Sequence, residues 1–199
     1  MDFSGEYIIP STKQKVWDAL NDPEVLKQCI DGCEELNKES ESEFSARVTA
    51  KVGPVRAKFS GKVTLSDIDP PNGYKISGEG QGGVAGFAKG GAAVKLEDSD
   101  GGTKLTYTAE AEVGGKLASV GSRLVEGVAK KTADDFFGKF AEIVSIDSKL
   151  EDTDTKGAQV QQVAEGSSKT SDNSRDNSRL FWGVGAAVAI VAILYTIFG

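Results

Sequence analysis

Residues 44–52 and 55–65 alternate hydrophobic and polar side chains with a period of two. This period is typical of a strand with one face buried and one in water, because successive side chains of a strand point to opposite faces. Gly53 and Pro54, which separate the two stretches, favour a turn. The pattern therefore predicts an antiparallel hairpin with a dry face and a wet face.

The same alternation returns further along the chain, in residues 74–76, 92–96 and 105–113. Residues 70–73 and 98–102 are rich in turn-forming residues and separate these segments. Consecutive strands joined by short turns form antiparallel sheets, which commonly bury one face only. We therefore expect one antiparallel sheet built from consecutive strands.

Three segments carry hydrophobic residues at helical spacing. The segment from Ser11 to Leu20 begins at a residue that caps helices, and the segment from Pro23 to Gln28 begins with proline, which suits a first turn. Residues 116–144 place apolar side chains near the helical period, as a helix packed on one face does. The expected fold class is α+β, a curved antiparallel sheet wrapped around one long C-terminal helix.

The inward positions of this sheet include many small residues among a few large ones. The small residues are Ala46, Ala50, Ala57, Gly61, Gly78, Gly80, Ala109 and Ala111. Small side chains leave space inside a curved sheet unless the helix approaches closely. Either the helix packs closely on the sheet or a cavity lies between them, and both arrangements stay open. A wide sheet that faces a single helix favours the cavity. Its lining would be apolar and would suit a hydrophobic ligand.

The C-terminal part of the chain has two segments of opposite character. Residues 147–179 are polar and lack aromatic residues, so we expect a disordered linker. Residues 180–198 are apolar and uncharged, and a helix of this length, roughly 28 Å, matches the bilayer core. Arg175 and Arg179 precede this segment. Positively charged residues beside a membrane-spanning helix stay on the cytoplasmic side. We predict a folded domain over residues 1–146 and a single-pass transmembrane tail anchor that holds it at the cytoplasmic face of the cell membrane.

Composition excludes several classes of chemistry. The chain has 23 Lys and Arg against 30 Asp and Glu, a net charge of −7, which argues against nucleic acid as a partner. It contains no histidine, so Ser-His-Asp triads and histidine metal sites are excluded. Its N-terminus lacks the basic and apolar regions of a signal peptide, so we expect the domain in the cytoplasm.

The remaining reactive residues have simple explanations. Cys29 and Cys33 either pack as small residues at a helix end, which a reducing cytoplasm favours, or form a regulatory disulfide or half a metal site. The glycine-rich residues 78–91 lack the Gly-Lys-Ser/Thr ending of a phosphate-binding loop. Glu110 and Glu112 fall on the wet face, and no acid–base pair lies inward. We therefore expect no catalytic residues, no metal site and no enzyme activity.

The outward positions of the first predicted hairpin carry five cations and no acid, although the whole chain is acidic. We call these residues the basic row: Arg47, Lys51, Arg56, Lys58 and Lys62. Two interpretations stay open. The row either keeps the surface soluble and protects a sheet edge, or it docks an acidic enzyme surface or anionic lipid headgroups.

Three segments carry a family resemblance. They read PSTKQKVWDALNDPEVLKQCIDGCEEL at 10–36, GGVAGFAKGGAAVKL at 82–96 and VGGKLASVGSRLVEGVAKKTADDFFGKF at 113–140. Together they resemble the carbon monoxide dehydrogenase G-subunit family, a branch of the START-related helix-grip superfamily that includes polyketide cyclases and lipid-transfer proteins. The resemblance covers residues 1–146. One position departs from the family pattern, because Asp31 stands where members usually carry proline between the cysteines.

The resemblance implies a helix-grip fold, no catalytic role, and recruitment of a CO dehydrogenase-type molybdenum hydroxylase to the cytoplasmic membrane. The superfamily implies a pocket for hydrophobic ligands between the sheet and the long helix. A membrane tether, an apolar pocket and a redox partner together suggest a lipid-soluble electron carrier such as a quinone, and another isoprenoid or a lipid would satisfy the same residues. The alternatives are a membrane-tethered lipid-binding or lipid-transfer module without a redox partner, and a cyclase-like enzyme, for which the inward positions supply no acid or base.

We predict that the pocket lies between the inward strand positions and the first part of the long helix. Bulky residues, Phe136, Phe137 and Phe140, fill the other part. The walls, the polar handle and the helix residues of the pocket would be Phe59, Phe87, Tyr107, Leu117, Val120, Gly121 and Leu124.

Overall fold

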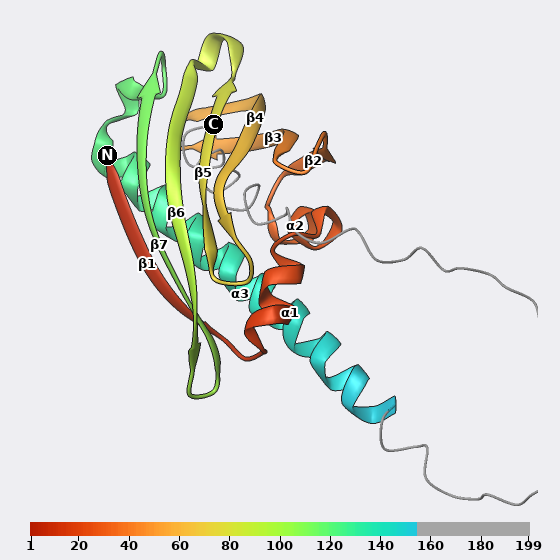
Figure 1. Cartoon of the computed structure of the whole chain (residues 1–199). Coiled ribbons are helices and arrows are strands. Elements are labelled where there is room, and N and C mark those ends of the chain that lie inside the picture. Colours follow the sequence, from red (N-terminus) through yellow and green to blue (C-terminus); the bar gives the residue numbers. More distant parts are fainter. Residues whose placement is uncertain (155–199) are drawn as a thin grey trace, which may run out of the picture.

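The structure, a computed structural model, describes residues 1–154, with side chains described to residue 145. Its centre is a seven-stranded antiparallel sheet with the strand order β1-β7-β6-β5-β4-β3-β2 (Figure 1). The strands are β1 (Asp2–Ile9), β2 (Cys33–Lys38), β3 (Glu43–Val52), β4 (Val55–Asp69), β5 (Gly73–Gln81), β6 (Phe87–Ser99) and β7 (Gly102–Gly114). The predicted antiparallel sheet and its short turns are therefore confirmed.

The register of the strands confirms which side chains face inward. Val48 pairs with Phe59 across β3 and β4, and Ile76 pairs with Ala92 across β5 and β6. All four residues are buried, whereas the alternate positions on these strands are mostly exposed. The alternation thus separates the two faces of the sheet as predicted.

The pattern did not predict the edge strand β2. This strand buries only Leu36 among its six residues, so its sequence has almost no alternation to detect. Its position follows from pairing with β3, where Leu36 lies opposite Ala46. The opposite edge is β1, which pairs with β7 and so places the first strand of the chain beside the last.

Two short helices, α1 (Lys13–Ala19) and α2 (Pro23–Cys29), follow β1. Thr12, and not the predicted Ser11, caps α1, because its hydroxyl accepts a hydrogen bond from a first-turn N–H at 3.4 Å. Ser11 is buried instead, and its carbonyl accepts a hydrogen bond from the Thr103 hydroxyl at 2.8 Å. The prediction of the second helix is confirmed, including its initial proline.

The long helix α3 (Ser122–Asp154) begins and ends later than predicted. A 3₁₀ turn, Ala118–Val120, comes before it, and Gly121 follows with a φ of 92°, a conformation that glycine adopts easily. The helix therefore cannot begin at Lys116. Its last part, residues 147–154, belongs to the segment that we predicted as a linker.

The predicted tail anchor lies outside the part of the chain that the structure describes. Residues 155–179 of the predicted linker and the apolar residues 180–198 lie outside the described residues. Within residues 1–154, no helix is both long enough and apolar enough to cross a membrane. The tail anchor therefore stays a prediction from the sequence.

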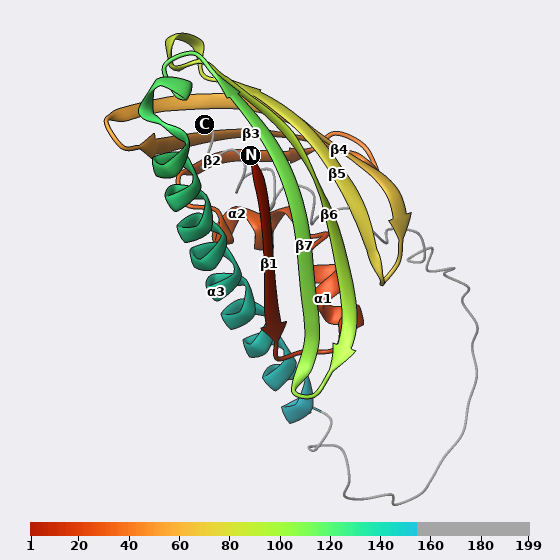
Figure 2. The same cartoon turned by 90° about the vertical axis from the view of Figure 1, so that its left-hand side faces the viewer.

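Helix α3 runs along the concave face of the sheet, with its first turns near the β3–β4 turn and its later turns near α1 (Figure 2). Its middle turns bury Phe136, Phe137 and Phe140 almost completely. Nearby, Trp17 of α1 packs edge-on against Tyr74 of β5, with ring centroids 5.5 Å apart. The interior between the middle of α3, α1 and β5 is therefore filled by large aromatic side chains.

Among the described residues, the hydroxyl of Tyr74 is a buried polar group without a hydrogen-bond partner. Burial holds its pKa well above the ordinary value. An unsatisfied buried hydroxyl costs about 1–3 kcal/mol. Tyr74→Phe is therefore expected to raise the free energy of unfolding by about 1 kcal/mol in urea denaturation.

Tyr7→Phe is the matched control, because the Tyr7 hydroxyl donates a hydrogen bond to Asp134 at 2.8 Å. Removal of this donor is expected to lower the stability. If Tyr74→Phe also lowers it, the Tyr74 hydroxyl has a partner in solution, such as a buried water or a ligand.

Candidate functional site

The inner face of the sheet, which α3 covers, differs in burial between its two ends. One end, at α1 and the β4–β5 and β6–β7 turns, has inward residues that are almost completely buried, among them Leu65, Tyr74, Leu96 and Leu105. The other end has several inward residues that are partly exposed, among them Val55, Ala57 and Val113. We call these the closed end and the open end.

Three segments meet at the open end: the β3–β4 turn, the loop 82–86 and the segment 114–121 that leads into α3 (Figure 2). The backbone N–H of Leu117 donates a hydrogen bond to the carbonyl of Ala85 at 3.1 Å. This bond joins the segment 114–121 to the loop 82–86. A Cβ placed on Gly53 would lie 2.6 Å from Cδ2 of Leu124, so the first turn of α3 rests on the β3–β4 turn.

All of the predicted ligand residues except Tyr107 lie at this open end. Phe59 and Leu117 are fully buried, Phe87 and Val120 are partly buried, and Gly121 and Leu124 are exposed. Leu117, Val120 and Gly121 precede α3 and do not lie on it, which corrects their predicted place on the helix. Phe87 is placed by its register on the outer face, beside Gly114, which corrects its predicted place as an interior wall. The binding role of the other residues stays a prediction.

The aromatic side chains of this set lie against glycines. A Cβ placed on Gly82 would lie 1.8 Å from the ring of Phe59, and one placed on Gly114 would lie 2.2 Å from the ring of Phe87. Tyr107 covers its cross-strand neighbour Gly5 in the same way, at 2.5 Å. Rings of Phe59 and Tyr107 therefore fill the space beside Gly82 and Gly5, and the ring of Phe87 covers Gly114 on the outer face.

Tyr107, the predicted polar handle, lies in a cluster with Tyr7 of β1 and two residues of α3. The ring of Phe137 stacks on that of Tyr7 at 4.2 Å between centroids and on that of Tyr107 at 6.0 Å. Burial raises the pKa of Tyr107, and the negative charge of Asp134 raises it further. Its hydroxyl is therefore protonated at neutral pH and is a hydrogen-bond donor.

The structure places acidic residues beside the basic row, which the sequence pattern did not predict. Arg47 pairs with Glu35 of β2 at 2.7 Å, and Lys58 pairs with Glu34 at 2.9 Å. Hydrogen bonds from Lys58 and Thr49 lower the pKa of Glu34. Two cations of the basic row are thus neutralised by the edge strand.

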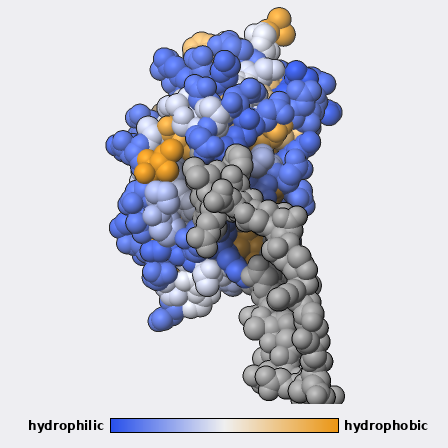
Figure 3. Space-filling model, turned by 45° about the vertical axis from the view of Figure 1, so that its right-hand side comes forward, coloured by the Kyte–Doolittle hydropathy of each residue, from blue (hydrophilic) through white to orange (hydrophobic). Residues whose placement is uncertain are grey.

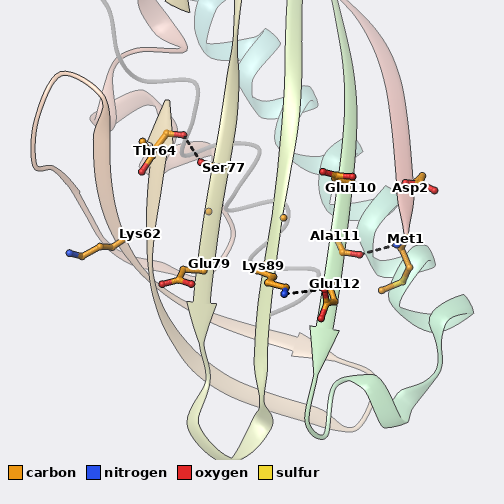
Figure 4. Close-up of a pocket in the computed structure, with 12 residues that line it drawn as sticks. Met1, Asp2, Lys62, Thr64, Ser77, Glu79, Lys89, Glu110, Ala111 and Glu112 are labelled. Atoms are coloured by element: carbon orange, nitrogen blue, oxygen red, sulfur yellow. Dashed lines mark hydrogen bonds and ion pairs between the residues drawn. The ribbon is translucent and has the colours of Figure 1, made fainter. Parts of the chain in front are cut away.

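The outer face of the sheet carries two hollows. The larger one, with a volume of about 870 Å³, is lined mainly by polar and charged side chains of β4, β5, β6 and β7. Figure 4 shows a row of alternating charge across these strands, formed by Lys62, Glu79, Lys89 and Glu112. These residues are cross-strand neighbours, and Lys89 pairs with Glu112 at 3.1 Å.

Alternating charges on neighbouring strands stabilise a sheet, and they give this hollow a surface unsuited to an apolar ligand. The second hollow, of about 590 Å³, adjoins the first and shares Asp2 and Glu110 with it. None of the predicted ligand residues lines either hollow, and Lys62 is the one basic-row residue that does. Both hollows lie opposite the predicted pocket.

Both cysteines are free thiols. Burial raises the pKa of Cys29 to about 12 and also raises that of Cys33 above its ordinary value. Asp31, which lies between the two cysteines, accepts a hydrogen bond from the ammonium group of Lys139 in α3. The residue that departs from the family pattern therefore joins the α2–β2 turn to the helix.

Because the thiolate is the reactive form, iodoacetamide at neutral pH is expected to modify Cys33 slowly and Cys29 hardly at all in the native protein. Peptide mapping by mass spectrometry would measure both rates. In urea the two thiols should react at similar rates. Fast modification of native Cys29 would contradict the buried position that the fold gives it.

A curved antiparallel sheet gripping one long C-terminal helix, with an open end in the interior, defines a helix-grip domain. The family model of the carbon monoxide dehydrogenase G-subunit (CoxG) matches residues 5–145. The chain therefore belongs to the CoxG family, as its sequence motifs indicate, and this membership indicates a role associated with carbon monoxide dehydrogenase. No curated protein matches the chain.

Solved structures share the fold. A conserved protein from Geobacillus kaustophilus is 36% identical, with a TM-score of 0.68 over 73% of this chain and 95% of that one. A protein from Thermus thermophilus is 16% identical, with a TM-score of 0.56 over 74% of this chain and 99% of that one. A protein from Rhizobium leguminosarum is 15% identical, with a TM-score of 0.56 over 73% and 94%. The matched domain makes up nearly the whole of each of these chains.

Proposed function

We propose that this protein is a membrane-anchored adaptor that recruits a CO dehydrogenase-type molybdenum hydroxylase to the cytoplasmic face of the cell membrane. Membership of the CoxG family supports the association with this enzyme system. The apolar segment 180–198 supports the membrane location. In this proposal the chain supplies no catalytic residue, because domains of this family and fold typically act by binding.

The adaptor also binds a hydrophobic ligand, such as a quinone, between the sheet and α3. The observation that carries this half of the proposal is the burial difference between the two ends of the inner face. A uniformly filled interior would bury both ends equally. The partly exposed inward residues at the open end are apolar, as a site for a greasy molecule requires.

The described residues suit the parts of a quinone. Val55, Ala57 and Val113, which face inward and are apolar and partly exposed, would contact its ring and isoprenoid tail. Tyr107 packs against Gly5 and Phe137 away from the open end, so it would contact only a ligand that reaches past the open end to the aromatic cluster. When bound, a quinone would supply the electron-accepting chemistry, and the residues of this chain would hold and orient it.

The test is to purify the full chain from its own membranes in mild detergent. Native mass spectrometry would show a bound organic molecule, and affinity capture would show whether a molybdenum hydroxylase accompanies the chain. Both findings together support the adaptor. A bound lipid without a hydroxylase favours the second candidate, a membrane-tethered lipid-binding or lipid-transfer module. If neither a bound molecule nor a hydroxylase is found, the proposal is wrong.

A further inference from the structure

Two cations of the basic row have neither an ion pair nor an acid opposite them among residues 1–154. Lys51 and Arg56 are exposed and lie directly opposite each other across β3 and β4, one residue pair away from the turn. Arg47 and Lys58 are neutralised by β2, and Lys62 lies opposite Glu79. The unpaired charge of the row is thus concentrated at the tip of the β3–β4 hairpin, at the open end.

The segment that leads into α3 adds more positive charge at the same end. Lys116 and Arg123 are exposed and have no ion pair within the described part of the chain. Arg123 lies in the first turn of α3, which contains no acidic residue. A helix N-terminus already carries a partial positive charge, so a cation there adds to the local potential and does not offset it. One exposed acid, Glu126, lies nearby in the next turn.

The open end also exposes apolar side chains. The face in Figure 3 is mostly hydrophilic, and its hydrophobic patches are small and separate. Among the described residues, the exposed large hydrophobics are Ile8, Ile68, Val84 and Leu124. Val84 is 84% exposed at the tip of the loop 82–86, and Leu124 is 41% exposed on the β3–β4 turn. Both lie at the open end, which Figure 2 shows at one extremity of the molecule.

We propose that this surface docks the folded domain directly on an anionic phospholipid bilayer, with the open end of the interior facing the lipid. We call the surface the rim, and its residues are Lys51, Arg56, Val84, Lys116, Arg123 and Leu124. Clustered cations next to exposed aliphatic side chains fit phosphate headgroups and the acyl boundary beneath them. The rest of this acidic protein is repelled by an anionic surface, which favours one orientation.

The inference deepens the proposed membrane role and rests on it, but the rim and the predicted anchor are separate parts of the chain. Residues 1–154 alone are suitable for a test, because the Geobacillus kaustophilus chain consists almost wholly of the matched domain. Without residues 180–198, any binding to vesicles must come from the domain. A failure of the rim therefore leaves the anchor and the adaptor function untouched.

The experiment is co-sedimentation of residues 1–154 with vesicles of phosphatidylcholine alone and of phosphatidylcholine mixed with phosphatidylglycerol. We expect binding to the mixed vesicles only, and we expect it to fall as salt increases. The double reversal Lys51→Glu with Arg56→Glu is expected to weaken binding by about tenfold or more. Val84→Asp is expected to weaken binding as well, while circular dichroism shows an unchanged fold for both variants.

The matched control is Lys75→Glu with Lys95→Glu, which changes the net charge equally on the outer face of β5 and β6. It should weaken binding much less than the rim reversal. Equal losses for both pairs would show a charge effect without a docking surface and would overturn the proposal. Absence of binding to the mixed vesicles would also overturn it. If the rim reversal abolishes only capture of the hydroxylase by the full chain, the rim is a protein-docking surface and the proposal is wrong.

Discussion

Ala57→Phe is expected to abolish ligand binding while the domain stays folded. Ala57 faces inward at the open end, where it is partly exposed and lies opposite Ala50 of β3. A phenyl ring there would occupy the space in which the proposed ligand lies. Gly121 is unsuitable for the same test, because its φ of 92° strains any other residue. Binding of menadione by equilibrium dialysis and of co-purified lipid by mass spectrometry would measure the loss.

Ala133→Phe is the matched control for this filling experiment. Ala133 is inward on α3 and only 1% exposed, so the same enlargement must displace packed neighbours. Overpacking of a filled core typically costs about 1–3 kcal/mol. We therefore expect a lower thermal midpoint for Ala133→Phe and little change for Ala57→Phe. Similar destabilisation by both substitutions would mean that the open end is filled and that the ligand-binding half of the proposed function is wrong.

The strands of the sheet could be predicted because alternation is a local property of the sequence. Each inward residue of β3 and β4 is recognised from its immediate neighbours, and the register then follows from the short turn at Gly53. The start of α3 could not be predicted in this way. Leu117, Val120 and Leu124 keep the helical spacing across Gly121, and only the backbone conformation of that glycine shows that the helix has not begun.

The charge of the basic row depends on contacts that are distant in sequence. Residues 45–62 contain five cations and no acid, so the sequence suggests one uniform patch. The acids that neutralise Arg47 and Lys58 come from β2, a strand with a weak pattern of its own. Only the pairing of β2 with β3 divides the row into a neutralised part and an unpaired tip.

The volume of the interior stays a prediction. Small inward residues favour space, but the sequence does not show which ring covers which glycine. That depends on cross-strand register, as for Tyr107 over Gly5. The sequence pattern also did not single out Val84, a residue of the proposed rim. The signal was a lone branched apolar residue in the glycine-rich segment 78–91.

Phe137→Ala is expected to destabilise the domain by about 3–5 kcal/mol, a large share of the stability of a domain of this size. Phe137 is 2% exposed and holds together the aromatic cluster between α3 and the β1 edge. Its ring stacks on Tyr7 at 4.2 Å and meets Phe136 edge-on at 5.1 Å. Its loss leaves a cavity between two elements that the short turns of the sheet do not connect. Urea denaturation of residues 1–154 would measure the change.

Gly138→Ala, one residue further along the same helix, should have the opposite effect. A Cβ on Gly138 would meet no atom within 4 Å, and the residue is exposed. Alanine in a helix interior is about 0.5–1 kcal/mol more favourable than glycine, so the midpoint in urea should rise. Changes of opposite sign in the free energy of unfolding at these two adjacent positions test which face of α3 packs on the sheet. If Phe137→Ala is nearly neutral, or if Gly138→Ala destabilises the domain, the helix packs through a different face from the one described.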